Sequence, residues 1–352
     1  RTVMGALHTE ITKLLGIRHP VLLAGMGNIA HRDLVAAVSN AGGLGTIGGI
    51  FLNPKMLRKE IKAVKALLHD KQSPKFGVDL LIPKVGSGAR KTNSDYNEGN
   101  LPELINVIIE EKTTLFVSAV GVPPRWVVEK LHKAGIPVMN MCGAPRHAHK
   151  AIEVGCDIVC CQGSEGGGHT GDIGTSVLVP ECVDICRGKT SELTGGPVLV
   201  VAAGGIFDGR GLAAALAYGA HAVWVGTRFV ATKEAAASRI HKKNLLASTS
   251  SDTIRTLIYS GRPLRCIKND YIMDWEENRS SEIKALTAKG VLPYQQDMAD
   301  KQKSGESFSI ARSMPHLCGQ CAGPIHEVTT AAEVVEELVQ GAISAIKTIS
   351  KL

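Results

Sequence analysis

Glycine-rich turns and one histidine carry the chemical signal in this sequence. The stretch 162–171, which reads QGSEGGGHTG, sets His169 among glycines. Glycine lets backbone N–H groups approach an anion or a flat ring without interference from a Cβ atom. Three other short segments that follow apolar runs share this character: Gly25, Met26 and Gly27; Ala203, Gly204 and Gly205; and Gly226 with Thr227. The pattern predicts a ligand-binding face built largely from backbone.

His169 is the residue that we expect to perform catalysis. Histidine titrates near neutral pH, which suits proton transfer and hydrogen bonding to a substrate. A surface histidine in a flexible loop is the alternative, but a loop so rich in glycine has no packing reason to hold an imidazole. Glu165 in the same loop is a weaker candidate, and we expect it to stabilise the loop or to face solvent.

The segments 203–205 and 226–227 predict a phosphate site. They follow the seventh and eighth apolar runs of a regular series. In (β/α)8 barrels, the loops after these two strands and the N-termini of nearby helices form the usual phosphate site. We therefore expect a ligand that carries phosphate.

The apolar runs alternate with amphipathic stretches up to residue 246. The runs span 21–26, 44–47, 76–82, 115–120, 136–141, 158–161, 198–203 and 222–225. Continuous and often β-branched, they are typical of strands buried on both faces of a parallel sheet. Helical stretches span 33–39, 55–68, 101–111, 125–133 and 211–218, and the eighth is expected at roughly 232–246. A doubly wound open sheet also alternates, but eight consecutive parallel strands favour an α/β fold, the TIM (β/α)8 barrel.

We expect three segments along the chain. Residues 1–246 form the barrel, residues 247–323 form an extension or lid that covers the active-site face, and residues 324–352 form a final helix and tail. The polar segment 84–100 after the third strand is longer than most loops, and long loops often carry function.

Composition excludes several classes of partner. The formal charge of +7 comes from Lys and Arg scattered along the chain without interleaved aromatics, which argues against nucleic-acid binding. No apolar run reaches the roughly 18 residues that span a bilayer. The nine Cys show no disulfide framework, which indicates a reducing compartment. Cys318 and Cys321 have the spacing of a dithiol or of half a zinc site, but no second pair accompanies them, so no metal is expected.

The last three residues suggest a location. Ser350, Lys351 and Leu352 spell SKL, the tripeptide that peroxisomal import receptors read at a free C-terminus. We expect a peroxisomal enzyme that binds an import receptor, and a cytoplasmic one if Leu352 is not the true terminus.

Three stretches together resemble the nitronate monooxygenase family, also called 2-nitropropane dioxygenases. They are AGMGNIAHRDLVAAVSNAGGLGTIGG near the start, QGSEGGGHTGDIGTSVLVP in the middle and VAAGGIFDGRGLAAALAYGAHAVWVGTRF later. The likeness runs in order from about residue 15 to 229 and continues more weakly through SGRPLR at 260–265. It closely resembles eukaryotic, especially fungal, members.

The resemblance implies a TIM barrel with non-covalent FMN. His169 would be the catalytic base, and the substrates would be O2 and a nitronate or nitroalkane such as propionate 3-nitronate. The remaining positions would contact FMN: Gly25, Met26 and Gly27 lie against its ring, Asp79 and Gln162 lie near the polar edge, Gly167 and Gly168 touch the flavin, and Ala203, Gly204, Gly205, Gly226 and Thr227 hold the phosphate.

Two positions depart from the family pattern. Asp79 stands where relatives usually have Asn, and a charged acid beside a flavin disfavours its anionic reduced form. Met141 ends the fifth strand where some relatives place Lys. Both differences bear on substrate and on flavin reduction more than on fold.

Other functions fit the same scaffold. Flavin-dependent enoyl-acyl-carrier-protein reductases and NADH:quinone reductases carry a similar Gly-Gly-His loop and take hydride from a nicotinamide cofactor. A phosphate-binding lyase or isomerase is the non-redox alternative and would be colourless, whereas a flavoprotein is yellow. A flavin-binding protein without turnover is the last alternative.

Overall fold

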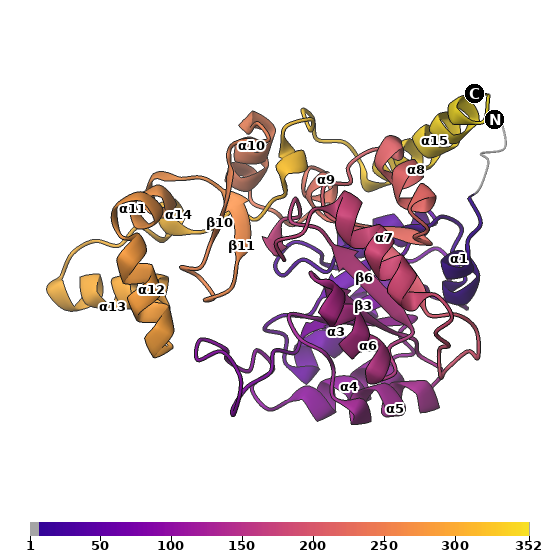
Figure 1. The fold of residues 1–352 in the computed structure, drawn as a ribbon, viewed down its shortest axis with the longest axis horizontal. Helices are drawn as coiled ribbons and strands as arrows, with labels where there is room; N and C mark the ends of the chain where they lie inside the picture. The colour runs from indigo at the N-terminus through magenta and orange to yellow at the C-terminus, as the bar shows by residue number, and fades with distance from the viewer. Residues whose placement is uncertain (1–6, 352) are drawn as a thin grey trace.

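Eight parallel strands close into a barrel, as the apolar runs predict (Figure 1). This computed structural model describes residues 7–351. The sheet order is β1-β9-β8-β6-β5-β4-β3-β2, and Leu23 N donates to Leu44 O at 2.9 Å to join its two edges. The strands are β1 Val21–Leu23, β2 Thr46–Gly48, β3 Gly77–Leu81, β4 Leu115–Ala119, β5 Val138–Cys142, β6 Ile158–Gln162, β8 Leu199–Ala203 and β9 Ala222–Val225.

Residues alternate between the barrel interior and the surrounding helices. Leu22, Leu115 and Met139 pack inside the barrel, while their chain neighbours Val21 and Phe116 pack outward against helices. Both clusters are buried, which is why these strands read as continuous apolar runs. The interior is a packed core, so function is left to the strand ends.

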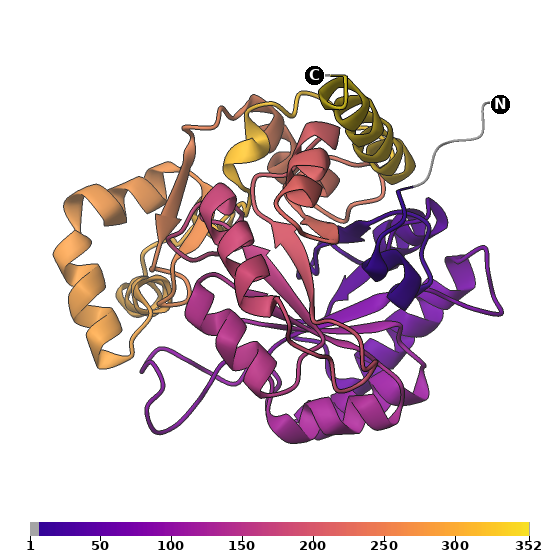
Figure 2. The same ribbon diagram turned by 45° about the vertical axis from the view of Figure 1, so that its right-hand side comes forward.

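Seven helices form most of the outer ring (Figure 2). They are α2 Arg32–Asn40, α3 Pro54–Leu67, α4 Leu101–Glu110, α5 Arg125–Lys133, α6 Pro145–Glu153, α7 Thr175–Cys186 and α8 Gly209–Ala217. Local signals fix their starts. Asn53 accepts from Met56 N and Pro54 occupies the first turn of α3, and Asp208 caps α8 by accepting from Arg210 N.

The predicted eighth helix at about 232–246 is wrong over its first half. A short helix, α9 (Thr227–Val230), follows β9, and the next helix, α10 (Arg239–Ala247), begins only after Ser238, whose hydroxyl accepts from His241 N. The place of the eighth ring helix belongs instead to α15 (Ala331–Ile349), which packs between α8 and α2. Gly209 and Gly341 allow this close approach, because a Cβ on Gly209 would lie 2.3 Å from Gly341 C.

Residues between α10 and α15 form a second sheet and a helical projection. The sheet order is β10-β11-β7, with β10 Thr253–Thr256, β11 Leu264–Ile267 and β7 Gly168–His169. Beyond it project α11 Asp270–Asn278, α12 Ser280–Lys289, α13 Pro293–Ser304 and α14 Ile310–Ser313 (left in Figure 1). Because β7 belongs to the loop after β6, this sheet ties the extension to the barrel mouth. The three-segment division stays a prediction.

The remaining elements are the N-terminal α1 (Glu10–Leu15) and the 3-10 helix η1 (Gln320–Ala322). No helix within residues 7–351 is long and apolar enough to cross a bilayer. Ser350 and Lys351 follow α15 and are exposed, but Leu352 lies outside the described residues. The peroxisomal location therefore stays a prediction.

Candidate active site at the barrel mouth

His169 lies in a short strand held from both sides. In β7 it pairs with Leu264 of β11, and its Nε2 lies 2.9 Å from Ser260 Oγ. Gln162, the last residue of β6, donates its amide Nε2 to the carbonyls of Gly167 and His169 at 3.1 and 3.0 Å. The glycine-rich loop is thus a positioned structure that fixes the imidazole at the end of β6.

The environment of His169 keeps its ring neutral. Burial, and to a smaller extent the nearby Arg262 cation, lower the pKa of His169 to about 4. With such a pKa the ring carries one proton and no charge at neutral pH. It can accept a proton or a hydrogen bond without first losing a proton of its own.

Backbone amides without protein partners gather at the ends of β8 and β9. Within residues 7–351, no acceptor receives a hydrogen bond from the N–H groups of Gly204, Gly205 or Thr227. Gly204 and Gly205 have φ values of 96° and 73°, which favour glycine. Adjacent amides in such conformations form a concave site for an anion. These positions are where the sequence predicts phosphate.

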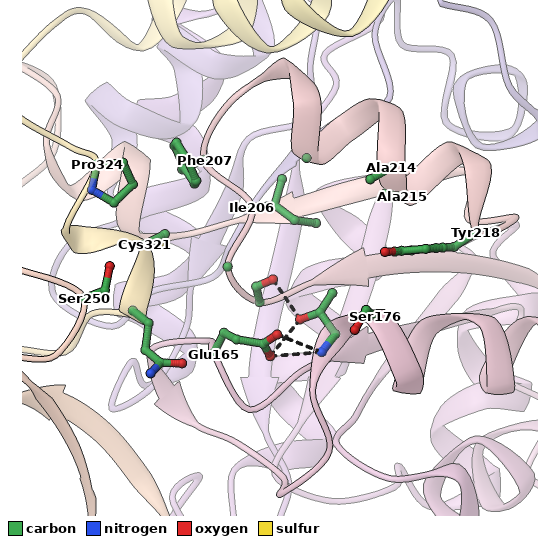
Figure 3. Close-up of a pocket in the computed structure, with 15 residues that line it drawn as sticks. Glu165, Ser176, Ile206, Phe207, Ala214, Ala215, Tyr218, Ser250, Cys321 and Pro324 are labelled. Carbon is green, nitrogen blue, oxygen red and sulfur yellow. Dashed lines mark hydrogen bonds between the residues drawn. The ribbon is translucent and has the colours of Figure 1, made fainter. Parts of the chain in front are cut away.

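A pocket of about 330 Å3 lies beside these amides (Figure 3). Gly204, Gly205, Gln320 and Ser250 line it, together with apolar residues of α8. Glu165 also lines it, and its carboxylate accepts from Thr175 N and from Thr175 Oγ1, each at 3.0 Å. Glu165 therefore anchors the start of α7, the loop-stabilising place that the sequence suggests.

Asp79 lies inside the barrel against Gly25. A Cβ on Gly25 would sit 2.4 Å from Asp79 Cβ, so the end of β1 must be glycine here. Asp79 is buried, and its Oδ1 has no hydrogen-bond partner among the described residues. Burial raises the pKa of Asp79 well above its usual range, which favours the protonated, uncharged carboxyl. In that form an acid can donate a hydrogen bond as Asn does, and the shift acts against the charge conflict expected from the sequence.

The other positions expected to touch flavin lie at the same end of the barrel. A Cβ on Gly226 would meet the sulfur of Met26 at 3.5 Å, and one on Gly27 would meet the Ile50 side chain. Gly168 has a φ of 70°. Met141, in place of Lys, packs against the apolar barrel interior.

The residues at this mouth fit FMN. The free amides at the ends of β8 and β9 suit its phosphate. The oxygen Oδ1 of Asp79 has no hydrogen-bond partner among the described residues and is available to a ligand. Gln162 fits a ligand only through its side-chain oxygen, because its amide nitrogen already donates to two carbonyls of the loop.

Cys318 and Cys321 belong to a segment that lies across this mouth. Gly319 N donates to Thr227 Oγ1 at 2.8 Å, and Gln320 N donates to Glu165 O at 2.9 Å. Both cysteines are buried and reduced. No group of three or more metal-ligating side chains occurs within residues 7–351.

Sequence reasoning missed Ser260 and Arg262. Both lie more than 90 residues from His169 along the chain, in the segment SGRPLR. The stretch was visible as part of the family likeness, but nothing local assigns its serine to an imidazole. Pairing of β11 with β7 brings it there.

Comparisons with known proteins agree with this architecture. A family model described as nitronate monooxygenase matches residues 8–341. The (3aS,4S,5R,7aS)-5-hydroxy-7a-methyl-1-oxo-octahydro-1H-indene-4-carboxyl-CoA dehydrogenase of Rhodococcus jostii is 32% identical, and the alignment covers 99% of both chains.

Two solved structures share the fold. FabK from Thermotoga maritima aligns with a TM-score of 0.75 and 29% identity over 98% of this chain and 99% of its own. The nitroalkane oxidase of Streptomyces ansochromogenes aligns with a TM-score of 0.78 and 26% identity over 96% and 99%. These relatives are bacterial, so they give no support to the expected fungal likeness. By the extent of the family match and the geometry of its barrel mouth, the chain belongs to the nitronate monooxygenase family and is a flavin-dependent oxidoreductase.

Proposed function

We propose that this protein binds FMN and uses O2 to oxidise alkyl nitronates, such as propionate 3-nitronate, to a carbonyl compound and nitrite. The observation that carries the proposal is the fixed imidazole of His169 in the loop after β6, together with the unpartnered amides that follow the neighbouring strands β8 and β9. The family match and the nitroalkane oxidase likeness support it. Bound FMN would accept electrons from the substrate and pass them to O2.

The protein's part is to hold the substrate and manage one proton. Ser260 Oγ donates to Arg262 O at 3.4 Å, so its oxygen is left to accept from His169 Nε2–H. That arrangement leaves His169 Nδ1 as the unprotonated nitrogen. Nδ1 would remove the α-proton of a neutral nitroalkane, while a substrate that arrives as the nitronate needs no such step.

Asp79 and the glycine amides would hold the cofactor. The protonated carboxyl of Asp79 would donate to the polar edge of the ring, and Gly204, Gly205, Gly226 and Thr227 would bind its phosphate. Gly25, Met26, Gly27, Gly167 and Gly168 would face the ring.

The decisive experiment is anaerobic reduction of the purified holoenzyme. Propionate 3-nitronate, NADH and NADPH are mixed separately with the protein, and flavin absorbance is followed in a stopped-flow instrument. The nitronate should bleach the flavin fastest. Bleaching by a nicotinamide cofactor alone would contradict nitronate oxidation and support the alternative below.

The alternative is an FMN-dependent, nicotinamide-linked oxidoreductase that acts on an acyl thioester. The relative from Rhodococcus jostii, named as a carboxyl-CoA dehydrogenase, aligns over 99% of both chains, which favours this candidate over the quinone reductase type. NADH or NADPH would then supply the electrons that bleach the flavin, and an α,β-unsaturated CoA thioester would accept them in the reductive direction.

Location is a separate proposal. If Leu352 is the C-terminal residue, the SKL tripeptide would direct the protein to peroxisomes, as expected of a eukaryotic member. A fluorescent protein fused ahead of the full chain should then enter peroxisomes, and deletion of residues 350–352 should leave it in the cytoplasm. Unchanged import after the deletion would refute this address.

A further inference from the structure

An unpaired arginine lies at the barrel mouth, two residues beyond the partner of His169. Arg262 is half-buried, and its Nε donates to Asn93 Oδ1 at 3.2 Å. Within residues 7–351, no carboxylate lies within ion-pair distance of this guanidinium, and neither Nη group donates to a protein acceptor. The planar fork of Arg262 is therefore open to a ligand.

The groups around Arg262 add positive charge. Arg90, from the long loop 84–100, donates through Nη1 to Gly261 O at 3.4 Å. Burial lowers the pKa of Arg262, and the charge of Arg90 lowers it further. In that loop, the Asp95 carboxylate accepts hydrogen bonds from the backbone amides of Asn97 and Gly99 at 2.9 and 2.8 Å.

The start of α6 continues this positive rim. Arg146 and Lys150 are exposed there. The pKa of His147 is lowered mainly by burial, and the positive charges of Arg146, Lys150 and Arg262 lower it as well. Asp172 on the neighbouring loop is already paired with Arg255 at 2.7 Å. The rim on this side of the mouth therefore carries a net positive charge that the described acids do not balance.

An aromatic pair lies beside the same rim. Phe51 follows β2, and Tyr96 belongs to the loop 84–100; their ring centroids are 6.0 Å apart. Phe51 is 64% exposed and has a φ of 62°. A bulky residue at positive φ is strained, and such strain concentrates at ligand sites. The pair offers an apolar surface near an open cation.

We propose that Arg262 is a specificity-determining residue that binds an anionic group, a carboxylate or a phosphate, on the end of the substrate remote from the reacting carbon. This inference rests on the proposed function, which places the reacting carbon beside His169. A guanidinium fork holds a carboxylate or phosphate through two parallel hydrogen bonds. The rim would also attract anionic substrates and disfavour neutral nitroalkanes.

The test measures binding without turnover. Succinate resembles a carboxylated nitronate, because a carboxylate is planar and anionic like the nitronate group, and monomethyl succinate lacks the second charge. Dissociation constants of both are measured by calorimetry on FMN-loaded wild-type protein and on Arg262→Gln. We expect the wild type to bind succinate at least about tenfold more tightly than its ester, and Arg262→Gln to lose most of that ratio.

Two further variants separate charge from structure. Arg262→Lys keeps the charge without the fork and should retain part of the preference. Arg239→Gln removes an exposed arginine from the start of α10 and should leave the wild-type ratio unchanged. The flavin content and melting temperature of each variant report whether it folds.

A second pair of probes identifies the anion's source. Crotonyl-CoA carries phosphates that crotonyl-pantetheine lacks, so the ratio of their dissociation constants reports binding of a phosphate. If Arg262→Gln reduces the preference only in this pair, Arg262 binds a phosphate. If it reduces the preference only in the succinate pair, Arg262 binds a carboxylate. If Arg262→Gln keeps the wild-type ratio for both pairs, the inference is overturned. None of the probes contains a nitro group, so this result does not depend on whether nitronates bleach the flavin.

Discussion

Replacement of His169 by Ala separates two roles that a single activity assay would merge. The variant loses the nitrogen that we expect to take the α-proton of a nitroalkane, but it keeps the amides at the ends of β8 and β9. FMN content should therefore equal that of the wild type. Turnover of a neutral nitroalkane should fall, while turnover of the preformed nitronate should fall much less.

The size of the loss follows from the chemistry of the ring. A positioned general base contributes roughly 10²- to 10⁴-fold to proton transfer, so kcat/KM for nitroethane should drop by about that range. For the ethyl nitronate, His169 contributes at most a hydrogen bond. Loss of one such bond costs about 1 kcal/mol, or roughly fivefold in kcat/KM.

The pH dependence gives an independent check. Since the pKa of His169 is lowered to about 4, wild-type activity on nitroethane should not fall as the pH drops through 6.5, where an ordinary histidine gains its proton. It should fall only as the pH approaches 4. Ser260→Ala removes the hydrogen-bond partner at 2.9 Å, which should lower the rate on nitroethane by about two- to tenfold without changing FMN content.

The measurement is oxygen consumption with each substrate form, over the pH range in which the protein stays folded. If His169→Ala reduces both rates by the same factor, the ring does not act as a base. A wild-type profile with an inflection near 6.5 would contradict the described surroundings of His169.

Three further predictions test the site and its support. Asp79→Asn should raise the melting temperature of flavin-free protein more at pH 8 than at pH 5. A carboxyl whose pKa is raised on folding makes the folded protein less stable as the pH rises, and Asn removes this effect. An equal rise at both pH values would refute the raised pKa of Asp79. Gly204→Val should abolish most FMN retention on gel filtration, since its Cβ would lie 2.9 Å from Gly163 N at a φ of 96°; normal retention would place the phosphate elsewhere. Asp157→Ala should lower the free energy of unfolding by about 3–5 kcal/mol in urea, because the buried carboxylate accepts from Val138 N, Ser191 Oγ and His132 Nε2; a loss under about 1 kcal/mol would show that these contacts are replaceable.

The strands were predictable because burial on both faces leaves a continuous apolar signal. The same logic predicts the ligand-binding ends, since Gly25 lies near the end of the first such run and Gly204 directly follows the seventh. The eighth helix was not predictable, because its place is taken by residues that lie some hundred positions farther along. The stretch 232–246 is compatible with a helix on composition, and only tertiary packing decides that it begins at Arg239.

The surroundings of His169 were beyond sequence reasoning for a similar reason. The hydroxyl of Ser260 reaches His169 through a strand pairing that no local pattern encodes. The raised pKa of Asp79 also follows from burial, and the sequence shows only an acid where an amide is usual. Residue types indicate which chemistry is available, but the pKa values follow from packing.

The position of α15 between α8 and α2 has a consequence for how the molecule is made. A chain that leaves the ribosome from its N-terminus can pair all eight strands before the segment that seals the last gap in the helical ring has been synthesised. Until then, the apolar flanks of α8 and α2 face solvent. Completion of the barrel wall is therefore a late event in biosynthesis, and chains that end prematurely should be strongly prone to aggregation.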